Sequence, residues 1–149
     1  MIVRLMAYLL AIAAGAANPI QAGANAQLKA STGATVFAAT AVYLSGLGAM
    51  LVIQLFVREG WPTLGKLACT PWWAWTGGLL SIGSTMAAAA FAQRMGSGVF
   101  TGISVTASLV TSILLDNFGA AGFHTHPASP MRIFGGALMI TGLWLTAKF

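Results

Sequence analysis

Long apolar stretches separated by isolated charged residues dominate this chain. The uncharged stretches cover residues 5–28, 30–57, 67–93, 95–115 and 133–147. A bilayer core about 30 Å thick is crossed by roughly 20 helical residues at 1.5 Å each. The pattern therefore predicts an all-α integral membrane protein with a single transmembrane domain over residues 1–149. Five transmembrane helices are expected, at about 5–28, 34–57, 72–92, 98–115 and 133–147.

The N-terminal stretch also fits a second interpretation. A basic start at Arg4, an apolar run over 5–14 and Ala-Gly-Ala at 14–16 resemble a cleavable signal peptide. The uncharged run continues to Leu28, well beyond the apolar part of a signal, and this length favours a spanning helix. Removal of a signal would leave four spanning helices.

Composition supports a membrane protein. The chain is 58% hydrophobic and 6% charged, whereas soluble domains carry about 25% charged residues, so a soluble fold is nearly excluded. The net charge of +5 comes from basic residues placed singly near the ends of the predicted helices. Lys and Arg at such places extend to lipid headgroups. The basic charge therefore indicates the lipid bilayer as a partner and gives no sign of nucleic-acid binding.

Side chains that could carry chemistry are few. The only cysteine, Cys69, excludes an intrachain disulfide. His124 and His126 have no carboxylate or thiol beside them, so we expect no metal site there. No nucleophile–base pair and no phosphate-binding loop is visible. We therefore expect neither an enzyme nor a bound cofactor.

The basic residues barely specify an orientation in the membrane. Five spans place Arg4, Arg58, Lys66 and Arg132 on one side and Lys29, Arg94 and Lys148 on the other. Basic residues normally orient a membrane protein, and four against three is almost no bias. Two copies inserted in opposite orientations would form an antiparallel pair, an inverted repeat of the kind many transporters contain. The alternative is that the longer connector with Lys66 fixes one orientation.

Three amides share one face of the first predicted helix. Asn18, Gln21 and Asn25 fall within an arc of about 60° at 100° per residue. Pro19 has no N–H, so the Gly15 carbonyl loses its helical partner and a kink is expected. Amides need partners in hydrocarbon. They either bond neighbouring helices or bind substrate in a cavity, and both interpretations stay open.

Hydroxyl side chains on the other helices complete the candidate substrate site. Tyr43 lies deep in the second helix and needs a partner for its hydroxyl. Ser81 belongs to a stripe of small residues in the third helix that includes Thr85, and Ser104 and Ser108 form a stripe in the fourth. Small stripes also serve helix packing, so binding and packing remain alternative roles.

Four tryptophans cluster before and at the start of the third helix: Trp61, Trp72, Trp73 and Trp75. An aromatic belt at the membrane surface explains such a cluster. A wall at a substrate entrance is the alternative, and on that interpretation Trp75 contacts the substrate.

Two further pairs have candidate roles. Asp116 ends the fourth helix on the side where Arg132 begins the fifth. The two form either an interfacial ion pair or a gate. Gly98 and Gly102 form a GxxxG pattern, which serves packing within the bundle or a dimer seam.

Three segments together resemble the YdcZ-type family of the drug/metabolite transporter superfamily. They are Pro19–Leu28, Pro71–Gly78 and Leu114–Gly119, and the resemblance covers about residues 1–148. It implies a five-helix half-transporter of the inner membrane, often paired as a dimer, with fused ten-helix relatives. The four-helix small multidrug resistance exporters are more distantly similar and carry an essential glutamate in their first helix. This chain has only Asn and Gln there, so proton-coupled cation export does not carry over.

The sequence therefore predicts a small multi-pass transporter for a neutral or zwitterionic metabolite or drug-like compound. An antiparallel homodimer and a heterodimer with a paralogue are both compatible with the pattern. A non-transporting membrane subunit, as an assembly or regulatory partner, is the alternative function.

Overall fold

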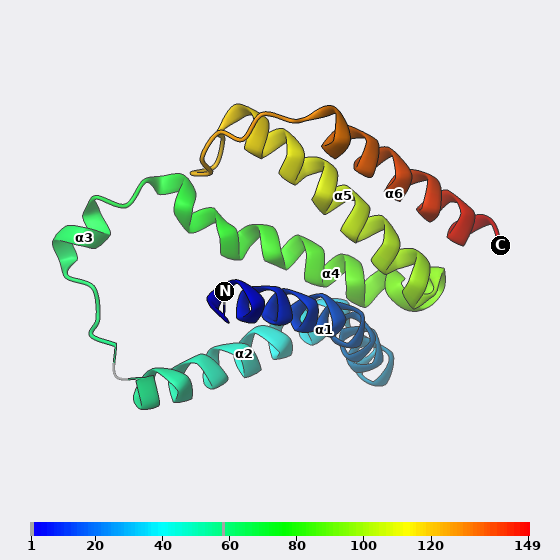
Figure 1. The fold of residues 1–149 in the computed structure, drawn as a ribbon. Coiled ribbons are helices and arrows are strands. Elements are labelled where there is room, and N and C mark those ends of the chain that lie inside the picture. The colour runs from blue at the N-terminus through cyan, green and yellow to red at the C-terminus, as the bar shows by residue number, and fades with distance from the viewer. Residues whose placement is uncertain (1, 58) are drawn as a thin grey trace. The chain divides into compact units, whose positions relative to one another are not determined.

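The structure is a computed structural model that describes residues 2–57 and 59–149, and helices are the only regular elements there. Its elements are α1 (Ile2–Thr32), α2 (Thr35–Val57), α3 (Leu64–Ala68), the 3₁₀ helix η1 (Trp72–Thr76), α4 (Gly77–Met95), α5 (Ser97–Phe118) and α6 (Pro130–Lys148) (Figure 1). The all-α prediction is confirmed. Arg58, one of the charges used to compare the two membrane sides, lies outside the described residues.

The five predicted helices correspond to α1, α2, α4, α5 and α6. Within the described residues, α1, α2 and α5 are long and apolar enough to cross a membrane. The helices α4 and α6 have 19 residues each and are rich in glycine, serine and threonine. These residues lower the mean hydropathy, so the sequence of α4 and α6 identifies them less clearly as spans.

The start of the third predicted helix differs from the expectation. Residues Trp72–Thr76 form η1, and the α-helix begins only at Gly77. Pro71 precedes η1 in an extended conformation, and the Ala74 N–H donates to its carbonyl over 3.0 Å. This hydrogen bond joins residues three apart in the sequence, which is the pattern of a 3₁₀ helix. The short helix α3 in the preceding connector was not predicted.

The chain forms two compact units. One contains the chain up to Pro19 together with Met95–Phe149, and the other contains Ile20–Arg94. The helix α1 belongs to both, and the division falls directly after Pro19. Pro19 cannot donate the backbone hydrogen bond that an α-helix normally forms at its position.

Alanine forms most of the core in the unit Ile20–Arg94. Its buried residues are Ala22, Asn25 and Ala26 on α1, Ala38 and Ala39 on α2, and Thr85, Ala88, Ala89 and Ala92 on α4. Small side chains allow helix backbones to approach closely, which is how helices associate where lipid removes the hydrophobic drive. Most of the large apolar side chains of α2 remain exposed.

The helices α5 and α6 form an antiparallel hairpin in the other unit (Figure 1). Gly102 of α5 lies against Leu143 of α6, and Ile113 of α5 lies against Gly136 of α6. Higher residue numbers in α5 therefore pair with lower residue numbers in α6, as expected for antiparallel helices. A Cβ on Gly102 would lie 2.9 Å from the Leu143 Cδ1 atom. Gly102 therefore allows a close contact within the chain.

Candidate functional site

A cluster of three hydroxyl groups joins α2 to α4. The Tyr43 hydroxyl donates to the Ser81 Oγ over 3.0 Å and lies 3.1 Å from the Thr85 Oγ1. The Ser81 hydroxyl in turn donates to the Gly78 carbonyl over 2.8 Å. Ser81 and Thr85 are one helical turn apart and share a face of α4. Tyr43 and Ser81 are half-buried and Thr85 is buried.

The direction of the hydrogen bonds in this cluster follows from proton counting. Tyr43 has one hydroxyl proton, and this proton lies in the hydrogen bond that Tyr43 donates to the Ser81 Oγ. The contact between Tyr43 and Thr85 therefore requires the Thr85 hydroxyl to donate. All three hydroxyl protons are used within the protein, whereas lone pairs on Thr85 and Ser81 remain available. The cluster is suited to accept hydrogen bonds from a ligand.

Tyr43 and Ser81 are predicted from the sequence as substrate-binding residues, whereas Thr85 is not. Thr85 was visible in the same small-residue stripe as Ser81. The sequence does not show which hydroxyl bonds to Tyr43, because both Ser81 and Thr85 lie on the same face of their helix. The structure shows that Tyr43 contacts both.

The amides of α1 have different environments. Asn25 is 4% exposed and lies between the buried residues Ala22 and Ala26. Gln21 is exposed, and Asn18 is exposed and precedes the division between the two units. Asn25 is therefore the amide that belongs to the core of the unit containing Tyr43.

We expect Asn25→Leu to weaken the binding of a transported compound roughly fivefold, the worth of one hydrogen bond of about 1 kcal/mol. Dimer assembly should survive. Gln27→Leu is the matched control, because it removes an exposed amide two residues along α1, on nearly the opposite face. Titration of the purified variants with an identified substrate provides the measurement. Unchanged affinity of Asn25→Leu would contradict a binding role for this amide, and loss of the dimer would indicate a packing role.

Three further substrate candidates are exposed. Ser104 and Ser108 are exposed on α5, and the Ser104 hydroxyl donates to the Phe100 carbonyl of its own helix over 3.0 Å. Trp75 is exposed on η1. The structure therefore brings together Tyr43 and Ser81, and it leaves binding roles for these three residues as predictions.

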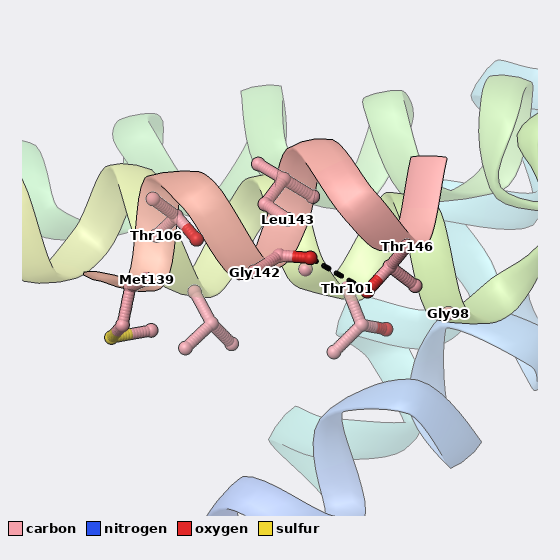
Figure 2. A pocket seen from close by; sticks show the side chains of 9 residues that line it. Gly98, Thr101, Thr106, Met139, Gly142, Leu143 and Thr146 are labelled. Carbon is pink, nitrogen blue, oxygen red and sulfur yellow. Dashed lines mark hydrogen bonds between the residues drawn. The ribbon is translucent and has the colours of Figure 1, made fainter. Parts of the chain in front are cut away.

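A groove of about 330 Å³ runs between α5 and α6. Its lining consists of Gly98, Thr101, Gly102, Val105, Thr106, Met139, Gly142, Leu143 and Thr146 (Figure 2). The Thr146 hydroxyl donates to the Gly142 carbonyl over 2.8 Å, and Thr106 is buried. The predicted GxxxG pair thus lies along one groove. A Cβ on Gly102 would meet Leu143 of α6, whereas a Cβ on Gly98 would have no atom of another helix within 4 Å.

The proposed gate pair is in contact. The Arg132 Nη1 lies 3.4 Å from the Asp116 Oδ2. The Asp116 carbonyl also accepts from the His126 N–H over 2.7 Å, and the Asn117 side chain accepts from the Ala128 N–H over 3.1 Å. These bonds hold the loop between α5 and α6 in place. A structural role for Asp116 is therefore an alternative to gating.

The histidines of this loop make local contacts. The His126 Nδ1 lies 3.0 Å from the His124 carbonyl oxygen. Across residues 2–57 and 59–149, no group of three or more histidine, cysteine or acidic side chains is placed to hold a metal ion.

If Asp116 is a gate, Asp116→Asn should change the transport rate and its response to pH while leaving expression intact. The ion pair is partly exposed, and such pairs contribute about 0–1 kcal/mol to stability. Thermal unfolding should therefore change little. Flux measured at acidic and at neutral pH provides the test, and Asn117→Leu is a control that loosens the same loop without removing charge. Wild-type flux by Asp116→Asn at both pH values would leave the pair with a structural role only.

The comparison with known protein families agrees with the resemblance stated from the sequence. The family model described as "Putative inner membrane exporter, YdcZ" matches residues 6–145, which is nearly the whole chain. The matched range contains all three segments on which the resemblance rests. No curated protein and no solved structure gives a significant match. The family and the apolar helices together identify a multi-pass inner membrane protein of a transporter class.

Proposed function

The chain belongs to the YdcZ family of inner membrane exporters, and we propose that it works as a dimer that exports a small polar or zwitterionic compound. The compound is a metabolite or a drug-like molecule. The second subunit is an antiparallel copy of the chain or a paralogue. Each subunit contributes five spanning helices.

Five spans per subunit agree with the helix lengths. The helices α4 and α6 have 19 residues each, roughly 28 Å at 1.5 Å per residue and close to the bilayer core of about 30 Å. Their small and hydroxyl residues are suited to contacts with neighbouring helices. Together with α1, α2 and α5, the helices α4 and α6 make five spanning helices.

The small core supports association of two subunits. In the described residues, the buried side chains are alanines together with Asn25, Thr85 and Thr106. Large apolar side chains of α1 and α2 are exposed, and either lipid or a second subunit covers them. The nearly equal number of basic residues on the two membrane sides favours insertion in both orientations. An antiparallel pair then forms an inverted repeat around the substrate pathway.

The observation that carries the substrate proposal is the hydroxyl cluster of Tyr43, Ser81 and Thr85. It accepts hydrogen bonds and has no charge, so it suits a ligand that presents N–H or O–H groups. The charged residues lie towards helix ends or in connectors. A buried net charge on the substrate would therefore lack a counter-charge beside the cluster. A neutral or zwitterionic compound meets both conditions.

Flux into vesicles tests the function. Compounds that raise the unfolding temperature of the purified chain in a metabolite screen identify candidate ligands, because a ligand that binds only the folded state stabilises it. Each candidate is then supplied to vesicles that contain the chain and to empty vesicles of the same lipid. Saturable flux that requires the chain supports transport. If no compound raises the unfolding temperature and no flux is detected, the chain is better explained as a non-transporting subunit.

A further inference from the structure

The connector between α2 and α4 exposes an unusual number of large apolar side chains. It contains four of the five tryptophans of the chain. Trp61 and Trp72 are each 79% exposed and Leu64 is 84% exposed. Neither α3 nor η1 contains a buried residue. Figure 1 shows α3 within this connector, between α2 and α4 along the chain.

The short helix α3 separates apolar from polar positions, and η1 aligns two of its tryptophans. In α3, Leu64, Leu67 and Ala68 lie at spacings of three and four and share one face, whereas Lys66 lies on nearly the opposite side. In η1, Trp72 and Trp75 are three residues apart and therefore aligned, because a 3₁₀ helix has three residues per turn.

Water is an unfavourable environment for such a segment. An isolated helix of fewer than about 12 residues is marginal in water, and α3 has five. Exposed indole rings add apolar surface that water does not solvate well. Tryptophan is enriched at the membrane–water interface, where the ring contacts apolar chains and its N–H reaches polar groups. A short amphipathic helix is also stabilised at this membrane–water interface, because its apolar face is buried there.

We propose that the connector lies in the plane of the bilayer surface and binds phospholipid there. Trp61, Leu64 and the aligned pair Trp72 and Trp75 insert between headgroups and the upper acyl chains. The Lys66 ammonium extends to lipid phosphate. The lipid bilayer itself is the partner of this surface.

This anchoring has a consequence for α4. The helix begins at Gly77, directly after η1, and Ser81 follows one turn later. Interfacial tryptophans set the depth and tilt of the helix to which they are attached. Bound lipid at η1 thus fixes the depth of the Ser81 and Thr85 hydroxyls in the membrane.

The single cysteine permits a direct test on the intact chain. Cys69 is exposed and is the C-cap residue of α3. A nitroxide label on Cys69, in vesicles of phosphatidylethanolamine and phosphatidylglycerol, reports its depth through collisions with oxygen and with a water-soluble nickel chelate. The ratio of oxygen to nickel collisions should be several-fold higher than for the control Cys69→Ser/His124→Cys, labelled in the α5–α6 loop. That loop contains no tryptophan.

Two outcomes would overturn the proposal. Equal nickel collisions at Cys69 and at position 124 would place the connector in water. Weak collisions with both reagents would show that protein covers it. The double variant Trp72→Ala/Trp75→Ala should move the Cys69 label towards water, whereas Trp144→Ala on α6 should not. Lys66→Glu should shift the label only in vesicles that contain phosphatidylglycerol, because the anionic lipid repels the new charge.

Discussion

Replacing Gly102 with leucine should lower the unfolding temperature of the detergent-solubilised protein by several degrees. A Cβ at this position would lie 2.9 Å from the Leu143 Cδ1 atom, and three further carbons would enter the contact between α5 and α6. Overpacking of this kind costs about 1–3 kcal/mol. Gly102→Ala should have a much smaller effect, because the end of the Leu143 side chain can move. Thermal unfolding followed by loss of the monodisperse chromatographic peak gives the measurement.

Gly98→Leu is the matched control for Gly102→Leu. It adds the same side chain one helical turn earlier, where the added Cβ has no atom within 4 Å beyond its chain neighbours and the surrounding backbone of its own helix. Its unfolding temperature should stay near that of the wild type. Loss of the dimer in Gly98→Leu alone would assign Gly98 to a dimer seam. Wild-type stability of Gly102→Leu would contradict the close α5–α6 contact.

The second large effect concerns orientation. Reporters at the C-terminus should detect the wild-type chain on both sides of the inner membrane, because four basic residues oppose three. Phe123→Lys/His124→Lys adds two charges to the side of Arg132. Nearly all copies should then adopt the orientation that places this side in the cytoplasm.

The opposite pair of substitutions provides the control for orientation. Ser31→Lys/Thr32→Lys adds two charges beside Lys29, on the other side. It should only shift the distribution towards the opposite orientation, because five basic residues then oppose four. A wild-type chain found in one exclusive orientation would contradict the antiparallel homodimer and leave the heterodimer with a paralogue.

The helices were predictable because charged residues interrupt the apolar runs near helix ends. The end of α5 was placed three residues early, since Asp116 suggested a boundary and the helix continues to Phe118. Gly119 then ends it with a φ of 60°, a left-handed conformation that glycine adopts readily. The connector helix α3 was not predictable, because five residues are too few for a periodic pattern to stand out from the neighbouring turn formers.

The candidate site was predictable in part. Sequence indicated that the hydroxyl of Tyr43 needs a partner, and the helix face of Ser81 was visible as a stripe. The pairing between α2 and α4 depends on the packing of helices separated by a long connector, and spacing within one helix carries no information about it. For the same reason, spacing alone could not distinguish buried Asn25 from exposed Gln21.

The central claim is that the hydroxyl cluster at Tyr43 binds the transported compound. Flux of an identified substrate into vesicles containing Tyr43→Phe tests it most directly, because this change keeps the ring and removes the hydroxyl that orients the Ser81 and Thr85 hydroxyls towards a ligand. Tyr8→Phe makes the same change at the other tyrosine, which is exposed on α1. We predict an apparent affinity roughly fivefold weaker for Tyr43→Phe, equivalent to about 1 kcal/mol, and wild-type flux for Tyr8→Phe. Equal, wild-type flux in both variants would contradict the claim.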